Sequence, residues 1–167
     1  PNFALFCQMT EQEQAEKTYH NILNLVWEFL TVKGAKINFE NQLEKLEEII
    51  PDVNDYDFFG VVPALDACEA LGELLHAIIA GETLEKAIQI SQISLGTVCS
   101  LLETQEDRDL SETELKSREE IEEELDLQWQ IYRLLKDCEK RDVDLILSLR
   151  NEIKQEGISN IGIKIEQ

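Results

Sequence analysis

The stretch PALDACEALGELLHAIIAGE, residues 63–82, decides the fold class. Pro63 suits the first turn of a helix, and Gly81 suits the position just after its last turn. Between them the apolar side chains fall on one side of a helical projection: Leu65, Cys68, Leu71, Leu75, Ile78 and Ile79. The stretch therefore predicts an amphipathic helix over residues 63–80 with one face directed toward a core.

The opposite side of this helix carries Asp66, Glu69, Glu73 and His76, at steps of three, four and three residues. Glu73 and His76 form a Glu-x-x-His pair, the ligand spacing of carboxylate-bridged metal sites in four-helix bundles. Such a site needs a second Glu-x-x-His motif, and His20 has no glutamate three residues before it. We expect a solvated helix face, and a single metal site using Glu69, Glu73 and His76 is the alternative.

Helical periodicity extends along most of the chain. We expect helices at residues 11–33, 39–50, 63–80, 83–103, 112–117, 119–137 and from there to 156. Thr10 and Glu13 have the spacing of a capping box for the first helix. That helix is apolar nearly all round, so we expect Ile22, Val26 and Trp27 to be buried at the centre of the fold. The sequence predicts an all-α, single-domain bundle of five to seven helices with an extended tail.

The segment between the second and third expected helices, residues 51–62, is unusually apolar for a loop. It contains Tyr56, Phe58 and Phe59. We favour aromatic side chains that pack under the bundle, although the pattern does not distinguish core packing from a binding site within residues 56–60.

Composition and charge exclude several classes of function. The 167 residues fit one domain, and 35 acidic against 15 basic side chains give a net charge of −20. Nucleic-acid backbones and anionic membrane surfaces repel such a protein. No apolar run approaches the roughly 18 residues that a membrane-spanning helix needs. The four cysteines show no disulfide or zinc-binding spacing, which fits a cytoplasmic protein, and the spacing of Cys7 and His20 does not support a catalytic dyad.

Negative charge is concentrated between Glu103 and Asp126, where twelve acidic residues stand against three basic ones. One interpretation is a solvated helix start, because acidic side chains favour the first turn of a helix. The other is an electrostatic surface for a basic protein partner. The residues that we would assign to it are Glu119, Glu120, Glu122 and Glu123.

The chain also resembles a known family, the YjaG-like bacterial proteins, whose domain is of unknown function. The stretches that carry the resemblance are PNFALFCQ at 1–8, WEFLTVKGAKINFENQLEKLEEIIP at 27–51, DYDFFGVVPALDACEALGELLH at 55–76, GETLEKA at 81–87, LQWQIYRLLKDCEKRDVDLI at 127–146 and SNIGI at 159–163. The resemblance implies a helical cytoplasmic protein and supplies no catalytic residue, cofactor or reaction. Family members continue before the first of these stretches, so the chain resembles one that lacks an N-terminal segment. We therefore expect uncovered apolar surface around Phe3, Leu5 and Phe6.

These observations lead to two functional interpretations. No biochemical activity can be assigned, and the first interpretation is a non-enzymatic, acidic, cytoplasmic interaction or regulatory protein without a cofactor. The alternative is a metal-dependent enzyme or metal-binding bundle that uses Glu73 and His76. The sequence identifies neither the partner nor the oligomeric state.

Overall fold

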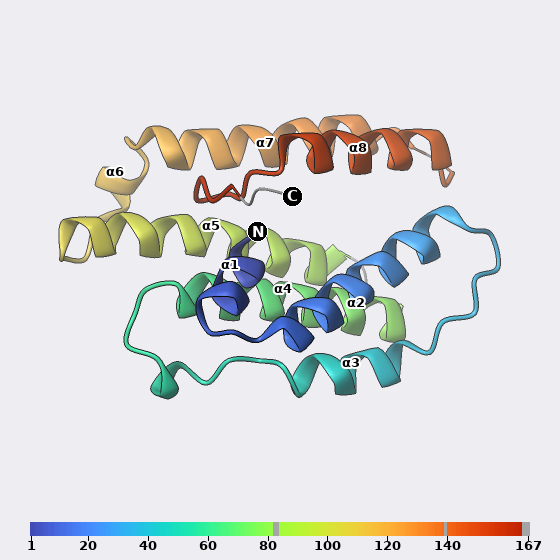
Figure 1. Cartoon of the computed structure of the whole chain (residues 1–167). Helices are drawn as coiled ribbons and strands as arrows, with labels where there is room; N and C mark the ends of the chain where they lie inside the picture. The colour runs from blue at the N-terminus through green and yellow to red at the C-terminus, as the bar shows by residue number, and fades with distance from the viewer. Residues whose placement is uncertain (82–83, 139, 165–167) are drawn as a thin grey trace.

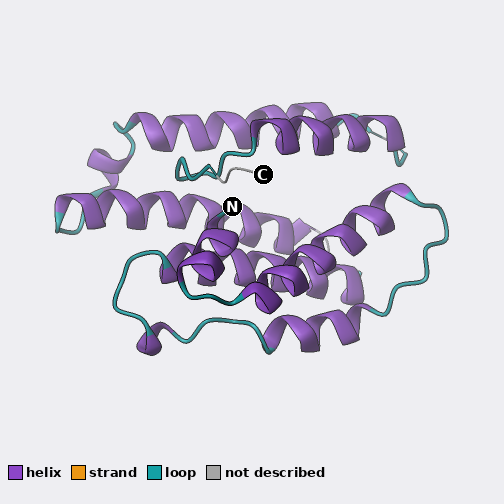
Figure 2. Cartoon of the chain, in the orientation of Figure 1, coloured by secondary structure: helices purple, strands orange, loops and turns teal. Residues whose placement is uncertain are grey.

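A computed structural model describes residues 1–81, 84–138 and 140–164. Within these residues the chain forms helices and one isolated β-bridge, which confirms the all-α class (Figure 1, Figure 2). The helices are α1 (Asn2–Met9), α2 (Glu13–Thr31), α3 (Phe39–Glu47), the 3₁₀ turn η1 (Val53–Asp55), α4 (Val61–Ala80), α5 (Leu84–Glu106), α6 (Glu112–Leu115), α7 (Glu119–Leu135) and α8 (Val143–Glu156). The eight α-helices in the described residues exceed the expected five to seven.

The additional helix is α1, which the sequence reasoning did not anticipate. Phe3 and Phe6 are buried in the main core, with the Phe3 ring centroid 4.7 Å from that of Tyr19 and the Phe6 centroid 4.9 Å from that of Tyr56. The expectation of uncovered apolar surface is therefore wrong for Phe3 and Phe6, and Leu5 is half-buried. Other segments of this same chain supply the cover.

The expected capping box at Thr10 is also wrong. The Thr10 hydroxyl donates to the Phe6 carbonyl oxygen at 2.8 Å, so it belongs to the end of α1. Glu11 takes a left-handed backbone conformation with φ of 57°, and α2 begins at Glu13 instead of Glu11. Because α1 ends at Met9, Thr10 forms the C-terminal cap of α1 and is not in position to cap α2.

The main core lies between α1, α2, α3 and α4. Its fully buried members include Ile22, Val26, Leu71 and Leu75, as expected. Trp27 is only half-buried, and the Arg150 guanidinium lies 5.7 Å from the centre of its ring. Although α2 is apolar on nearly all sides, only the side that packs against the main core is buried. Trp27 faces α8, which covers it only in part.

The aromatic loop before α4 belongs to this core. Tyr56 and Phe58 pack against the buried cluster, and the Gln12 amide nitrogen donates to the Tyr56 hydroxyl at 2.7 Å. Phe59 is half-buried. These contacts confirm the favoured interpretation of Tyr56 and Phe58 as core residues.

The second half of the chain forms an outer layer. α5 packs on α4, α7 runs antiparallel to α5, and α8 lies against α2 (Figure 1). A smaller buried cluster joins α5, α6 and α7 through Val98, Leu102, Leu110 and Ile121. The tail continues past the end of α8 to α5, where the Asn160 amide donates to the Ser94 carbonyl oxygen at 2.9 Å.

Several helix boundaries differ from those that we expected. α3 ends at Glu47 instead of residue 50, and α5 extends to Glu106 instead of residue 103. The expected start of that helix at residue 83 lies outside the described residues, as do residues 165–167 of the expected extended tail. Among the described residues, none of the helices combines the length and the apolarity that crossing a bilayer requires.

Candidate interaction surface

The polar face of α4 does not gather its four side chains into one site. The Thr97 hydroxyl donates to the Asp66 carboxylate at 2.7 Å, and burial raises the pKa of that carboxyl group. The Glu73 carboxylate pairs with the Lys86 ammonium at 2.5 Å, and both side chains are about three-quarters covered. Glu69 and His76 are exposed. The expectation of a mostly exposed face is therefore wrong for Asp66 and Glu73, which α5 covers.

This arrangement bears directly on the metal alternative. A cation at Glu73 and His76 would have to displace the Lys86 ammonium from the carboxylate. In the described part of the chain, no three His, Cys, Asp or Glu side chains are grouped so that they could hold a metal ion.

The buried cysteines are not placed for nucleophilic chemistry. Burial raises the pKa of the Cys7 thiol to about 12 and that of the Cys68 thiol to about 12. A thiol reacts as its thiolate, which is scarce near neutral pH at such pKa values. His20 is exposed on α2. The two cysteines serve the core as small apolar side chains.

The acidic stretch 103–126 divides into two parts, and its first part is internally paired. Arg108 bonds the Glu106 carboxylate at 2.9 Å and the Glu114 carboxylate at 2.8 Å, and Arg118 also pairs with Glu106. Hydrogen bonds from Arg108 and Ser111 lower the pKa of Glu114 to about 2. Lys116 pairs with Glu112 at 2.5 Å. All three basic side chains of the stretch are therefore engaged with its own acids.

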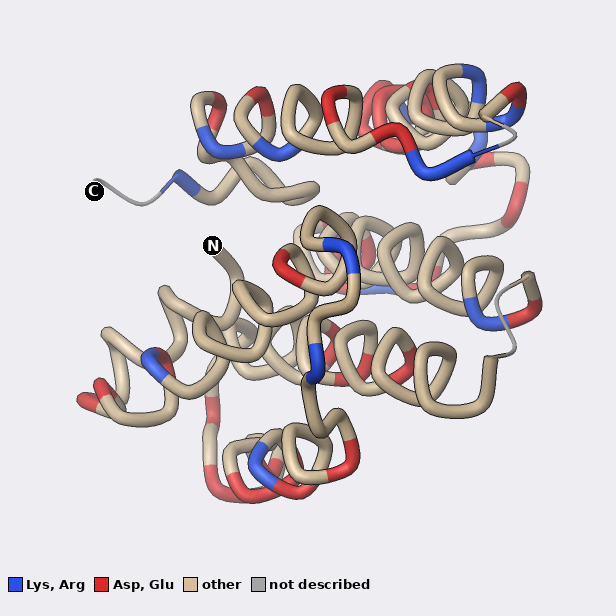
Figure 3. The backbone as a smooth tube through the Cα atoms, turned by 90° about the vertical axis from the view of Figure 1, so that its right-hand side faces the viewer, with Lys and Arg blue, Asp and Glu red and all other residues tan. Residues whose placement is uncertain are grey.

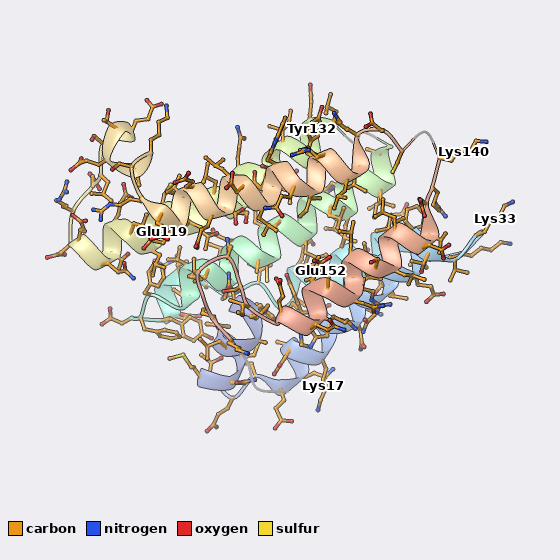
Figure 4. All side chains as sticks on the ribbon, turned by 90° about the horizontal axis from the view of Figure 1, so that it is seen from above. Lys17, Lys33, Glu119, Tyr132, Lys140 and Glu152 are labelled. Atoms are coloured by element: carbon orange, nitrogen blue, oxygen red, sulfur yellow. The ribbon has the colours of Figure 1, made fainter. Side chains whose placement is uncertain are left out.

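The second part is the start of α7, where the carboxylates have no such partners. Glu119, Glu120, Glu122 and Glu123 are exposed, and within the described residues none of them forms an ion pair. We call these four residues the acidic surface. Figure 3 shows how acidic positions outnumber basic ones along the chain, and Figure 4 labels Glu119 at the start of the helix.

Glu124 stands apart from its acidic neighbours because it faces α5. Its side chain is 6% exposed, and its carboxylate accepts a hydrogen bond from the Gln128 amide at 2.6 Å. The same amide donates to the Ser91 carbonyl oxygen at 3.1 Å. This network and buried Ile121 hold α7 against α5. The acidic surface therefore lies on the sides of α7 that do not face α5.

The second half of α7 carries a feature that the sequence reasoning missed. Five large apolar or aromatic side chains are 41–56% exposed there, and Leu125 just before them is 45% exposed: the five are Leu127, Trp129, Tyr132, Leu134 and Leu135. The sequence LQWQIYRLL, residues 127–135, did indicate this feature. Its apolar residues are distributed around the helix, so packing against α5 alone cannot bury all of them. Exposed apolar side chains gathered in this way are typical of protein interaction surfaces.

Comparison with known proteins supports the family resemblance. A sequence profile of the family described as "Protein of unknown function (DUF416)" matches residues 1–164. An uncharacterized protein of Haemophilus influenzae is 73% identical over 167 residues, which are all of this chain and 85% of that protein. Proteins named "Uncharacterized protein YjaG" from Salmonella typhimurium and Escherichia coli K12 are 52% and 51% identical over the same shares of the two chains.

A solved structure extends the likeness to the fold. The crystal structure of a DUF416 family protein from Shewanella baltica OS155 has a TM-score of 0.89 and 32% sequence identity, and the match covers 99% of this chain and 86% of that one. The resemblance to YjaG-like proteins is thus confirmed, and so is the interpretation that no biochemical activity can be assigned from the sequence. The chain belongs to the DUF416 family of proteins of unknown function.

Proposed function

We propose that this chain is a cytoplasmic interaction or regulatory protein that docks a basic protein partner on the acidic surface of α7. One observation carries the proposal. Glu119, Glu120, Glu122 and Glu123 are exposed and unpaired within the described residues, in a segment whose three basic side chains are all engaged elsewhere. A basic partner would supply the charges that the segment itself does not.

Repulsion among these carboxylates supports the same proposal. Glu119 and Glu123 stand four residues apart on one helix, a spacing at which like charges repel. The helix dipole offsets part of this cost, because carboxylates are favoured near a helix N-terminus. A cationic surface would offset it further, and long-range attraction would speed its approach.

The test compares two variants with the same change in charge. In the first, Glu119, Glu120, Glu122 and Glu123 are all replaced by lysine. In the second, lysine replaces four exposed acids on or just after α3, namely Glu40, Glu44, Glu47 and Glu48. Each protein is used to capture binding partners from cell extract at low and at physiological salt, and helix content is checked by circular dichroism.

We expect the wild type and the α3 variant to recover the same basic proteins, and the α7 variant to lose them. A recovered partner should also associate with the wild type more slowly at physiological salt than at low salt. The screening length at physiological salt is only about 8 Å, so long-range attraction is weakened. Equal recovery by all three proteins, or recovery of no basic protein by the wild type, would contradict the proposal. In that case the four carboxylates are a solvated helix face.

A further inference from the structure

A stripe of five exposed side chains runs along one side of α7 and its C-cap. The members follow steps of three, four, three and four residues: Glu122, Leu125, Trp129, Tyr132 and Lys136. Residues with this spacing share one side of a helix. We call this set the α7 stripe. It is distinct from the side that faces α5, where Ile121, Glu124 and Gln128 lie.

The centre of the α7 stripe is aromatic and internally ordered. The rings of Trp129 and Tyr132 stack on each other, with centroids 5.4 Å apart and planes inclined by 26°. Their exposed fractions are 56% and 55%. Stacking limits the conformations of both rings before any partner arrives, which lowers the entropic cost of binding. Tryptophan and tyrosine are also the residues that contribute most often to binding energy at interfaces.

The two ends of the α7 stripe carry opposite charges at equal distances from its centre. Glu122 precedes Trp129 by seven residues, and Lys136 follows it by seven. Two turns therefore separate each charged end from the aromatic centre. A stripe with this pattern is complementary to its own reversed copy: Glu122 meets Lys136, Leu125 lies within one residue of the level of Tyr132, and Trp129 meets Trp129.

We propose that a second copy of this chain docks on the α7 stripe, with the two α7 helices antiparallel and related by a two-fold axis at Trp129. An interface of this kind uses the same surface on both subunits, as the commonest soluble dimers do. A parallel arrangement would place Glu122 against Glu122 and Lys136 against Lys136, so charge selects the antiparallel one. This inference does not depend on the proposed basic partner.

The surroundings of the α7 stripe leave room for the second copy. Tyr132 lies at the edge of the molecule away from α8 (Figure 4). On neighbouring α5, Leu84 and Ile88 are 74% and 51% exposed. The hydrogen bond between Gln128 and Ser91 places this start of α5 at the level of Tyr132 and Lys136, so it adds apolar surface beside that end of the stripe.

The charge of the chain opposes self-association only at long range. Two copies of net charge −20 repel each other, but at physiological ionic strength the screening length is about 8 Å. Burial of the aromatic centre and pairing of the ends act within that distance. Dimer formation should therefore be measured at 0.15 M salt, where repulsion is largely screened.

The first experiment is sedimentation velocity over a concentration series, with matched double variants. Trp129→Ala with Tyr132→Ala removes the aromatic centre of the stripe. Leu127→Ala with Leu134→Ala removes two side chains of similar exposure, each 50%, from the other flank of α7. We expect the wild type and the Leu127/Leu134 variant to reach twice the 19.2 kDa monomer mass, and the Trp129/Tyr132 variant to stay monomeric.

A charge-swap series tests the register of the two helices. Glu122→Lys and Lys136→Glu should each weaken dimerisation, since each places like charges opposite one another. The double variant restores opposite charges and should recover the wild-type dissociation constant. A double variant weaker than both single variants would overturn the antiparallel register.

Two further outcomes would overturn the proposal itself. One is a wild type that remains monomeric at tens of micromolar, and the other is a dimer that survives loss of both aromatic rings. The Trp129/Tyr132 variant keeps every carboxylate of the acidic surface. Loss of the dimer with retained capture of a basic protein would therefore support this inference independently of the proposed function.

Discussion

The first half of the chain buries most of its large apolar side chains at least in part, whereas the second half leaves many of them exposed. Helices α1 to α4 enclose the main core, in which Phe3, Phe6, Leu71 and Leu75 are all at most 3% exposed. The cluster between α5, α6 and α7 is smaller, and none of the α8 side chains, all of which the structure describes, is fully buried. Amphipathic helices therefore build the main core in the first half of the chain, whereas in the second half they leave apolar side chains available for contact with other proteins.

Leu71 in the main core and Leu134 on α7 differ widely in exposure, at 3% and 50%. Leu71→Ala should lower the free energy of unfolding by about 2–5 kcal/mol, because it leaves a cavity in the main core. Leu134→Ala should change it by less than about 0.5 kcal/mol, because that side chain is 50% exposed. Urea unfolding of both variants measures the two values. Equal losses would mean that α7 is part of the same core and that the division of the molecule is wrong.

A second, smaller effect tests whether α7 is held by its polar network. Glu124→Ala removes the partner of the Gln128 amide at a buried position and should cost about 1–3 kcal/mol. Glu123→Ala alters an exposed side chain one residue earlier and should stay within about 0.5 kcal/mol of the wild type. Thermal or urea unfolding of both variants decides the matter. Similar values would show that the Glu124 network does not anchor α7.

The sequence predicted the fold best where one helix face is clearly apolar. The stripe of Leu71 and Leu75 on α4 is buried as periodicity indicated, and Gly81 and Gly157 end their helices in left-handed conformations. Periodicity failed for α1, since eight residues are too short to show a helical repeat clearly. Periodicity also failed for Trp27. A helix that is apolar on all sides gives no information on which other helices pack against each side.

The candidate surfaces were only partly accessible to sequence reasoning. Charge counting located the acidic stretch, but it could not separate buried Glu124 from exposed Glu123, which depends on where α5 lies. It also could not show that Arg108 and Arg118 are paired within the stretch. The apolar stripe with Trp129 was visible in the sequence, yet its exposure follows only from the tertiary arrangement.

The smallest expected effect concerns the contact between the two halves at Asp66 and Thr97. Burial raises the pKa of the Asp66 carboxyl group above its ordinary value of 3.8. A group whose pKa is raised by folding costs stability as the pH rises from the unfolded pKa through the folded one. Asp66→Asn removes this charge, so it should leave the protein as stable as the wild type or more stable at pH 7.

The hydrogen bonds at this contact also predict that Asp66→Asn does not lower the stability at pH 7. The Thr97 hydroxyl has one proton and two acceptors, the Asp66 carboxylate at 2.7 Å and the Ile93 carbonyl oxygen at 3.0 Å. The side-chain amide introduced by Asp66→Asn can donate to the Thr97 oxygen, which frees the hydroxyl proton for Ile93. A protonated Asp66 can do the same. The advantage of Asp66→Asn should therefore shrink as the pH falls toward and below 3.8.

Urea unfolding of wild type and Asp66→Asn between pH 3 and pH 7 measures this difference directly, with Glu69→Gln as an exposed control on the same helix. Other carboxylates titrate over this range in both proteins, so only the difference between them reports on Asp66. If Asp66→Asn is less stable than the wild type at pH 7, the carboxylate is needed where α4 meets α5. That result would make the contact between the two halves depend on charge as well as on apolar packing.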